Sequence, residues 1–412
     1  MIYKVKLPKF TRERLTDIVY LQMRLIRYAA STSTLSQESC ERYFKSYKRF
    51  QGRHQQIAEW IWRGSTKREL IEHFFNGSCS EKLEWSRCLF REVLILFNHP
   101  IGSITPHRNA TMPSWKNAGA DFLRKFYEEY LDGLPKSFFS EPGINKLSKV
   151  DIREEFNNTN EQLLVCPACD ISPKRTQIDH YLPISLYPHL SCHPFNLVPV
   201  CGDCNSPLVK GNTDFLEKNS VTRRSLEDIL LPYRSDGLAT HTHLSFAFSK
   251  GYKNPNKIEF KNNSEMNLIE YIEVYCSAYQ IPDRWLAGET FKIMESTLFR
   301  QIENSLRAAK RYKATLNIFD VRDCLDELLL SLHDDQGKTP FALPMTWWLT
   351  ALLNKEVEPA TLSPTVTETK NFQFLEEVAM WVYQETIQHP ANISDPRLDK
   401  ARRLRRIAAE GS

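Results

Sequence analysis

The sequence predicts a mainly helical α+β chain that contains one small module organised by metal ions. Two observations lead to this fold class. Over most of the 412 residues, apolar side chains recur every three or four positions, which is the period of an α-helix with one buried face. Residues 160–215 depart from this period and are rich in cysteine, proline and short β-branched runs, which is typical of a metal-organised module.

The individual elements follow from these periods and from turn signals. The helical period is present at residues 11–30, 54–75 and 118–131, and from residue 266 onward. A short strand is predicted at residues 2–7 and a β-hairpin at residues 243–261. Turn-rich residues 100–142 predict a connector around one helix, and a Pro- and Thr-rich break at residues 354–369 precedes the last helices.

These changes in pattern predict three domains. They are a basic helical domain at residues 1–150, a metal module at residues 151–235, and a hairpin followed by helices at residues 236–412. With 42% hydrophobic and 25% charged residues, the composition excludes a disordered or fibrous chain. No signal peptide and no run of ~18 uninterrupted apolar residues is present, so we expect a cytoplasmic protein without membrane contact.

The net charge of +4 conceals an asymmetry along the chain. Residues 1–150 sum to +10 and residues 151–412 to −6, so the N-terminal region is the favoured partner of a polyanion such as nucleic acid. Two basic segments, residues 45–56 and 399–410, are candidate phosphate-contacting faces. Solvated surface or a docking element for a partner is the alternative interpretation of each segment.

The ten cysteines include two C-x-x-C pairs, which are Cys166 with Cys169 and Cys201 with Cys204. Two tight turns of this kind present four thiolates to one tetrahedral ion, and four soft ligands without a redox requirement predict structural Zn²⁺. A redox dithiol and chance pairing are the alternatives. The other cysteines lack ligand spacing and are expected to be small buried or loop residues, as are His189 and His193.

Between the two cysteine pairs stands Asp179-His180, on a stretch that predicts a strand. Asn196 begins a second predicted strand, and a helix is predicted from the second cysteine pair. The order C-x-x-C, D-H, P-x-N-L-V-P, C-x-x-C-N and then Lys210 resembles the HNH endonucleases, over 50–60 residues. Their ββα-metal fold is often held by a four-cysteine zinc site, which makes a ββα-metal module inside a helical chain the expected fold.

The resemblance implies a role for each matching residue. His180 would be the general base that takes a proton from the attacking water, with Asp179 and Asn205 as ligands of a catalytic ion. Asn196 would tie the intervening loop to the strands. Because Asn205 stands where many members have histidine, the donors are oxygen atoms, which favours Mg²⁺ or Mn²⁺. Lys210 and Arg175 are candidate phosphate contacts, or equally solvated side chains.

The residues also fit the chemistry of phosphodiester hydrolysis. A histidine titrates near pH ~6.5 and accepts a proton from water without an unusual pKa, while a hard ion neutralises the phosphate. We therefore expect an HNH endonuclease or nickase acting on DNA. The alternatives are a ribonuclease acting on RNA, for example tRNA, and a non-catalytic zinc module that binds nucleic acid or a partner.

The order of module, L-P-Y, hairpin and helices also resembles nuclease subunits of bacterial phage-defence systems of the Septu, retron-associated and Zorya types. This resemblance implies an effector role in antiviral defence and a partner ATPase or sensor protein. The chain has no G-x-x-x-x-G-K-[ST] loop, so any ATP dependence would come from that partner.

Overall fold

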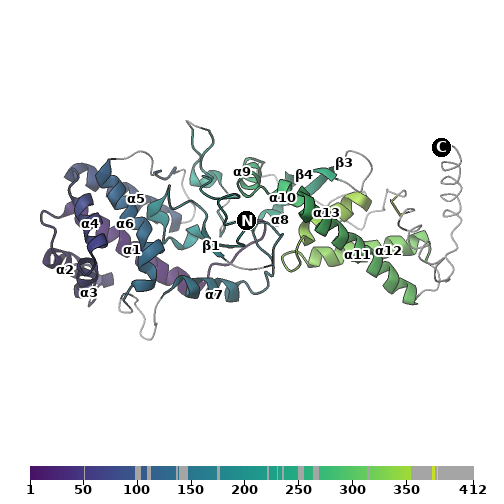
Figure 1. Ribbon diagram of the computed structural model, residues 1–412, viewed down its shortest axis with the longest axis horizontal. Coiled ribbons are helices and arrows are strands. Elements are labelled where there is room, and N and C mark those ends of the chain that lie inside the picture. Colours follow the sequence, from purple (N-terminus) through teal and green to yellow (C-terminus); the bar gives the residue numbers. More distant parts are fainter. Residues whose placement is uncertain are drawn as a thin grey trace. The chain divides into compact units, whose positions relative to one another are not determined.

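A computed structural model gives the fold, shown in Figure 1. The structure describes residues 1–50, 52–97, 104–108, 113–135, 138, 147–173, 177–219, 222–229, 231–233, 236–248, 255–262, 269–312, 316–353, 374–375 and 378. The described chain is mostly helical with two small antiparallel sheets, which confirms the predicted α+β class. None of the described helices is long and apolar enough to cross a membrane.

The chain forms two compact units, and the first comprises residues 3–161 and 174–235 together with Met1. Its elements are α1 (Lys9–Ser31), α2 (Gln37–Lys45), η1 (Lys48–Phe50), α3 (His54–Trp62), α4 (Ser65–Phe75), α5 (Cys79–Phe97), α6 (Ser114–Lys125), η2 (Phe126–Tyr130), η3 (Leu131–Gly133), α7 (Lys149–Thr159), β1 (Gln177–His180), η5 (Pro188–Leu190), η6 (Pro194–Asn196), β2 (Leu197–Val200) and η7 (Leu226–Asp228). Helix α1 packs on α4 and α5.

The buried stripe of α5 explains how this helix approaches the candidate site. Leu89, Val93 and Leu96 follow the three- and four-residue spacing of a buried helix face. Glu92 lies in the same stripe and is buried, although a carboxylate is costly there without partners. Helix α5 therefore presents a carboxylate to the interior, in addition to its buried Lys82 and Ser86.

Strands β1 and β2 form a two-stranded antiparallel sheet that carries the Asp-His pair. Asp179 lies opposite Val198 and His180 opposite Leu197. Every residue of β2 is buried, so the short apolar run is a core strand, as its composition predicts. Both predicted strands of the metal module are confirmed.

Two predicted elements of this region are wrong. Residues 2–7 contain no strand, because the Lys6 backbone bonds to the side-chain amide of Asn160 and not to a neighbouring strand. The helix predicted from the second cysteine pair is a series of turns. Gly211 has φ +46°, and its N–H donates to the Ser206 carbonyl. This left-handed residue closes the turn that starts at Ser206 and stops it from continuing as a helix. The ββα arrangement is thus present only as its two strands.

The second unit comprises residues 162–173 and 236–412 together with Ile2. Its elements are α8 (Leu238–His241), β3 (Thr242–Phe248), β4 (Pro255–Asn262), α9 (Ile269–Tyr279), α10 (Ile281–Leu286), α11 (Gly288–Tyr312), α12 (Ile318–Asp334) and α13 (Ala342–Leu353). The antiparallel pair β3 and β4 confirms the predicted hairpin. The break at residues 354–369 and the basic tail at residues 399–410 lie outside the described residues. The predicted division into three domains, at residues 1–150, 151–235 and 236–412, stays a prediction.

Candidate functional site

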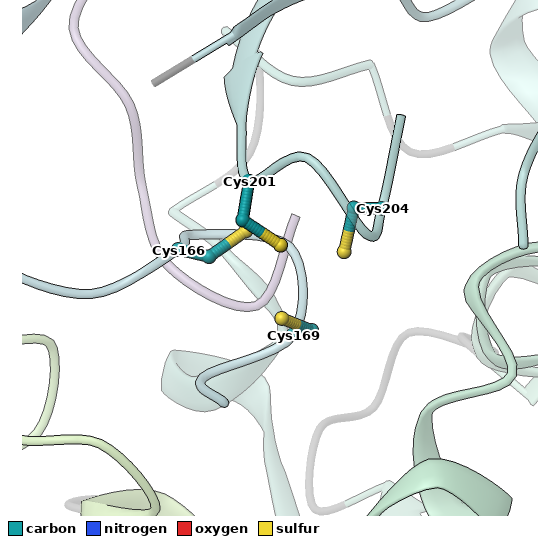
Figure 2. Close-up of side chains that lie close together, drawn as sticks. All are labelled: Cys166, Cys169, Cys201 and Cys204. Carbon is teal, nitrogen blue, oxygen red and sulfur yellow. The ribbon is translucent and has the colours of Figure 1, made fainter. Parts of the chain in front are cut away.

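The four paired cysteines come together as a candidate metal centre. The Sγ atoms of Cys166, Cys169, Cys201 and Cys204 all lie within 4.8 Å of one another, and the four residues are buried. Figure 2 shows the sulfur atoms turned toward one common space. Sulfur atoms around a tetrahedral Zn²⁺ are about 3.8 Å apart, given Zn–S bonds of ~2.3 Å. The cluster can therefore hold a metal ion such as zinc, without large rearrangement.

The first cysteine pair is shaped by a tight turn. The Asp170 N–H donates to the Cys166 carbonyl at 3.0 Å, and the Cys166 N–H donates to the Ser172 carbonyl at 2.9 Å. Asp170 has φ +58°, a left-handed conformation that aspartate tolerates better than most residues. This turn directs both thiols of the pair to the same side.

The carbonyl groups of this turn also have hydrogen-bond donors. The Ala168 carbonyl accepts from the Tyr275 hydroxyl at 2.9 Å, and the Cys169 carbonyl accepts from the Trp285 indole N–H at 3.0 Å. Both aromatic side chains are fully buried. These two donors satisfy buried carbonyl groups that would otherwise destabilise the turn.

Replacement of Trp285 by Phe should weaken metal binding at this turn. Trp285→Phe leaves the Cys169 carbonyl without its indole donor, at a cost of about 1–3 kcal/mol. Zinc affinity, measured by competition with a chelator, should fall roughly tenfold or more. Trp347→Phe is the matched control, because the buried Nε1 of Trp347 has no hydrogen-bond partner among the described residues. Equal zinc affinities in the two variants would contradict the prediction.

Asp179, one predicted ligand of the catalytic ion, is held by two groups. Its Oδ1 accepts from the His180 N–H at 2.7 Å, and its Oδ2 lies 2.9 Å from the Lys210 Nζ. Lys210 also donates to the His180 carbonyl at 2.7 Å and is only 2% exposed. Burial raises the pKa of Asp179, and the Lys210 ammonium opposes this shift. For Lys210 to contact phosphate, as the sequence suggests, its ammonium would have to leave this carboxylate.

His180 has a defined tautomer. Its Nε2 lies 2.8 Å from the Ser191 carbonyl, and because a carbonyl only accepts, Nε2 carries the proton. Burial lowers the pKa of His180 to about 3, below the ordinary value that the sequence led us to expect, so the ring is neutral at physiological pH but is a weaker base than a free histidine. A neutral ring protonated at Nε2 has its acceptor lone pair on Nδ1. The Tyr127 ring packs edge-on against this imidazole, with centroids 4.4 Å apart.

Neither Ser191 nor Tyr127 was among the predicted site residues. His180 bonds to the main-chain carbonyl of Ser191. The identity of the side chain at position 191 therefore does not reveal this contact in the sequence. Tyr127 lies in the π-helical turn η2, a local widening of the helix that the apolar spacing does not reveal.

The two asparagines occupy different surroundings. Asn196 ties the loop to the strands, since its Oδ1 accepts from the Leu182 N–H at 2.7 Å and its Nδ2 donates to the Leu182 and Leu190 carbonyls. Asn205 donates from Nδ2 to the Gln177 Oε1 at 2.8 Å. Gln177 stands two residues before Asp179 on β1 and therefore on the same face of the strand. Asn205 is thus bonded to the strand that carries Asp179, whose carboxylate is already paired with an ammonium.

The buried Glu92 contacts two histidines, of which His189 is buried and His107 is exposed. Glu92 Oε2 lies 2.9 Å from the Nε2 of His189, and Glu92 Oε1 lies 2.7 Å from the Nδ1 of His107. Burial alone would raise the pKa of Glu92, but the bonds from His107 and His189 outweigh it and lower the pKa to about 2. The same contact raises the pKa of His107.

The His107–Glu92 pair predicts a pH-dependent stability. The contribution of His107 is complete below the ordinary histidine pKa of 6.5 and is lost as the pH rises through its higher folded-state pKa. Glu92 loses its contribution only as the pH falls toward about 2. The difference in unfolding free energy between the wild type and His107→Gln should shrink by at most about 1 kcal/mol from about pH 6 to about pH 9, because the His107 side chain is 52% exposed. Urea denaturation at both pH values checks this, and a growing difference would contradict it.

The remaining predictions concern Arg175, the basic segment at residues 45–56 and the cysteines outside the cluster. Arg175 lies outside the described residues. In the basic segment 45–56, Arg49 is paired with Asp17 at 2.5 Å, and Arg53 donates to the Phe138 carbonyl. Among the cysteines without ligand spacing, Cys40, Cys192 and Cys324 are buried as expected, whereas Cys79 is exposed and Cys88 and Cys276 are partly exposed.

Comparison with known proteins finds one short similarity. A stretch of 40 residues is 52% identical to protein ea31 of Escherichia phage lambda, and it covers 10% of this chain and 14% of that phage protein. No family model matches the chain. No solved structure matches it either. Because the similarity is so short, the activity has to be inferred from the residues of the chain itself.

Proposed function

We propose that the chain is a metal-dependent endonuclease of the HNH type that hydrolyses phosphodiester bonds of DNA. The observation that gives this proposal its main support is the tautomer and orientation of the His180 ring. Its Nε2 proton is held by the Ser191 carbonyl, and its Nδ1 is therefore the acceptor. A neutral, oriented imidazole of this kind is suited to take a proton from water.

The neighbouring residues support the same role. Asp179 precedes His180 on β1, and the Asn196 amide fixes the loop that supplies the Ser191 carbonyl. Carboxylate and amide oxygens, as in Asp179 and Asn205, are donors that Mg²⁺ or Mn²⁺ prefers. Such an ion, when bound, would neutralise the phosphate and stabilise the leaving oxygen. In the present arrangement Lys210 already lies at the Asp179 carboxylate, so an ion there would replace the ammonium.

The cysteine cluster has a structural role in this proposal. Four thiolates complete a tetrahedral zinc shell and leave no position for water or phosphate. The catalytic and structural metal ions are therefore assigned to different residues, with zinc at the cysteines. We further propose that the enzyme serves antiviral defence together with a partner ATPase or sensor, on the sequence resemblance alone.

Incubation of the purified chain with supercoiled plasmid DNA and with total RNA tests the proposal. We expect nicked or linear DNA when Mg²⁺ or Mn²⁺ is present and intact DNA when EDTA is added. Degradation of RNA alone would make the chain a ribonuclease. If neither substrate is cut with either ion, the nuclease proposal fails and a non-catalytic zinc module remains, an outcome that the Asp179–Lys210 ion pair would also fit.

A further inference from the structure

The loop that supplies the Ser191 carbonyl is attached to three helices of the first unit. This loop, residues 188–193, lies between β1 and β2 in the sequence, and all of its residues are buried. Its His189 lies 2.9 Å from Glu92 on α5. The hydroxyl of Ser191 donates to the Leu123 carbonyl of α6 at 2.8 Å, and the Gln22 amide of α1 donates to the same hydroxyl at 3.1 Å.

These contacts are polar although they lie in the interior. Glu92, His189 and Gln22 are each 3% exposed or less, and buried polar groups destabilise a fold unless they are bonded. Apolar packing alone would bury the loop but would not fix the direction of its carbonyl groups. Here α1 and α6 each bond to the Ser191 hydroxyl, and α5 brings Glu92 within 2.9 Å of His189, so three helices together restrain the position of the Ser191 main chain.

We propose that Glu92, acting through His189, and Gln22, acting through Ser191, are positioning residues for the general base His180. This inference rests on the proposed function. The helices contribute no group to the reaction. They hold the carbonyl that keeps the His180 proton on Nε2, and thereby keep Nδ1 as the acceptor. Loss of one anchor frees the loop, the carbonyl shifts, and the imidazole populates the other tautomer and other orientations.

The test uses the full chain and the Glu92→Gln variant, which keeps the size of the side chain and removes its charge. Long-range ¹H–¹⁵N spectra of protein labelled with [¹⁵N]histidine report the tautomer of His180, assigned by the signal that is lost in His180→Gln. We expect one Nε2–H tautomer in the wild type and a mixture in Glu92→Gln. Cleavage should show kcat lower by roughly 10- to 100-fold, with KM and nucleic-acid affinity within about twofold of the wild type.

Two further variants keep the test decisive. Glu84→Gln, an exposed carboxylate on the same helix, should match the wild type in both measurements. Ser191→Ala removes the hydroxyl contacts with Gln22 and Leu123, and it decides the question if Glu92→Gln does not fold. An unchanged tautomer together with an unchanged kcat overturns the inference. If the wild type cuts no substrate, the proposed function fails, and the tautomer spectra alone decide whether these residues position His180.

Discussion

His180→Gln is expected to lower DNA cleavage by roughly 10²- to 10⁴-fold, the usual contribution of a general base. Glutamine has about the size of histidine, and its amide can donate to the Ser191 carbonyl as the imidazole does. It has no basic nitrogen, so water loses its proton acceptor. Gel-based plasmid cleavage at saturating Mg²⁺ or Mn²⁺ gives the rate of each variant.

Two controls separate chemistry from folding in this experiment. The variant should retain the zinc content of the wild type, and its affinity for uncut DNA should stay within about twofold, because His180 is buried and contributes little contact surface. Cleavage by His180→Gln at the wild-type rate would show that another group accepts the proton. His180→Ala should be equally inactive, although it also leaves a cavity beside Tyr127.

Loss of one cluster cysteine is expected to have the largest effect on the fold. Cys201→Ser should reduce zinc from one ion per chain to nearly none, because one oxygen replaces one of four clustered thiolates. Structural zinc sites contribute about 10–16 kcal/mol of apparent binding free energy, which is as large as the stability of a whole domain. The segments that carry the cysteines should therefore become sensitive to protease.

Cys192→Ala is the matched control for the cluster. Cys192 is buried and lies between the two pairs in the sequence, but its thiol is not part of the cluster. Its removal changes local packing and a contact with the Ser191 hydroxyl but takes no ligand from the cluster, so zinc content should be unchanged. Elemental analysis and limited proteolysis compare the two variants. A full zinc content in Cys201→Ser would contradict the four-thiolate assignment.

The sequence allowed good predictions where the signal is local. The C-x-x-C spacing predicts the cysteine cluster because each turn is set by a few consecutive residues. The alternation of QIDH and the apolar run LVPV predicted β1 and β2 for the same reason. The helix predicted after Cys204 was wrong because Pro207 and Gly211 lie inside its apparent period, and the left-handed φ of Gly211 ends the turn.

Local sequence patterns could not predict which residues contact the candidate site residues. The His180 ring bonds to a main-chain carbonyl, which any residue at position 191 would supply. Glu92 meets His189 from a helix 97 positions away, and nothing in either local pattern connects them. The sequence offered Lys210 as a candidate phosphate contact, which stays a prediction, and its burial against Asp179 depends on how the chain turns after the second cysteine pair.

If both proposed metal sites are filled, the Asp179–Lys210 ion pair implies an order in which they assemble. Because the ammonium neutralises the carboxylate, the strand pair folds without an unpaired buried charge and needs no divalent ion to do so. The cysteine cluster differs, since a zinc ion bound there would supply the energy that holds the two turns together. Under the proposed function, zinc would be required for folding, whereas a divalent ion at Asp179 would bind only afterwards, by displacing the Lys210 ammonium.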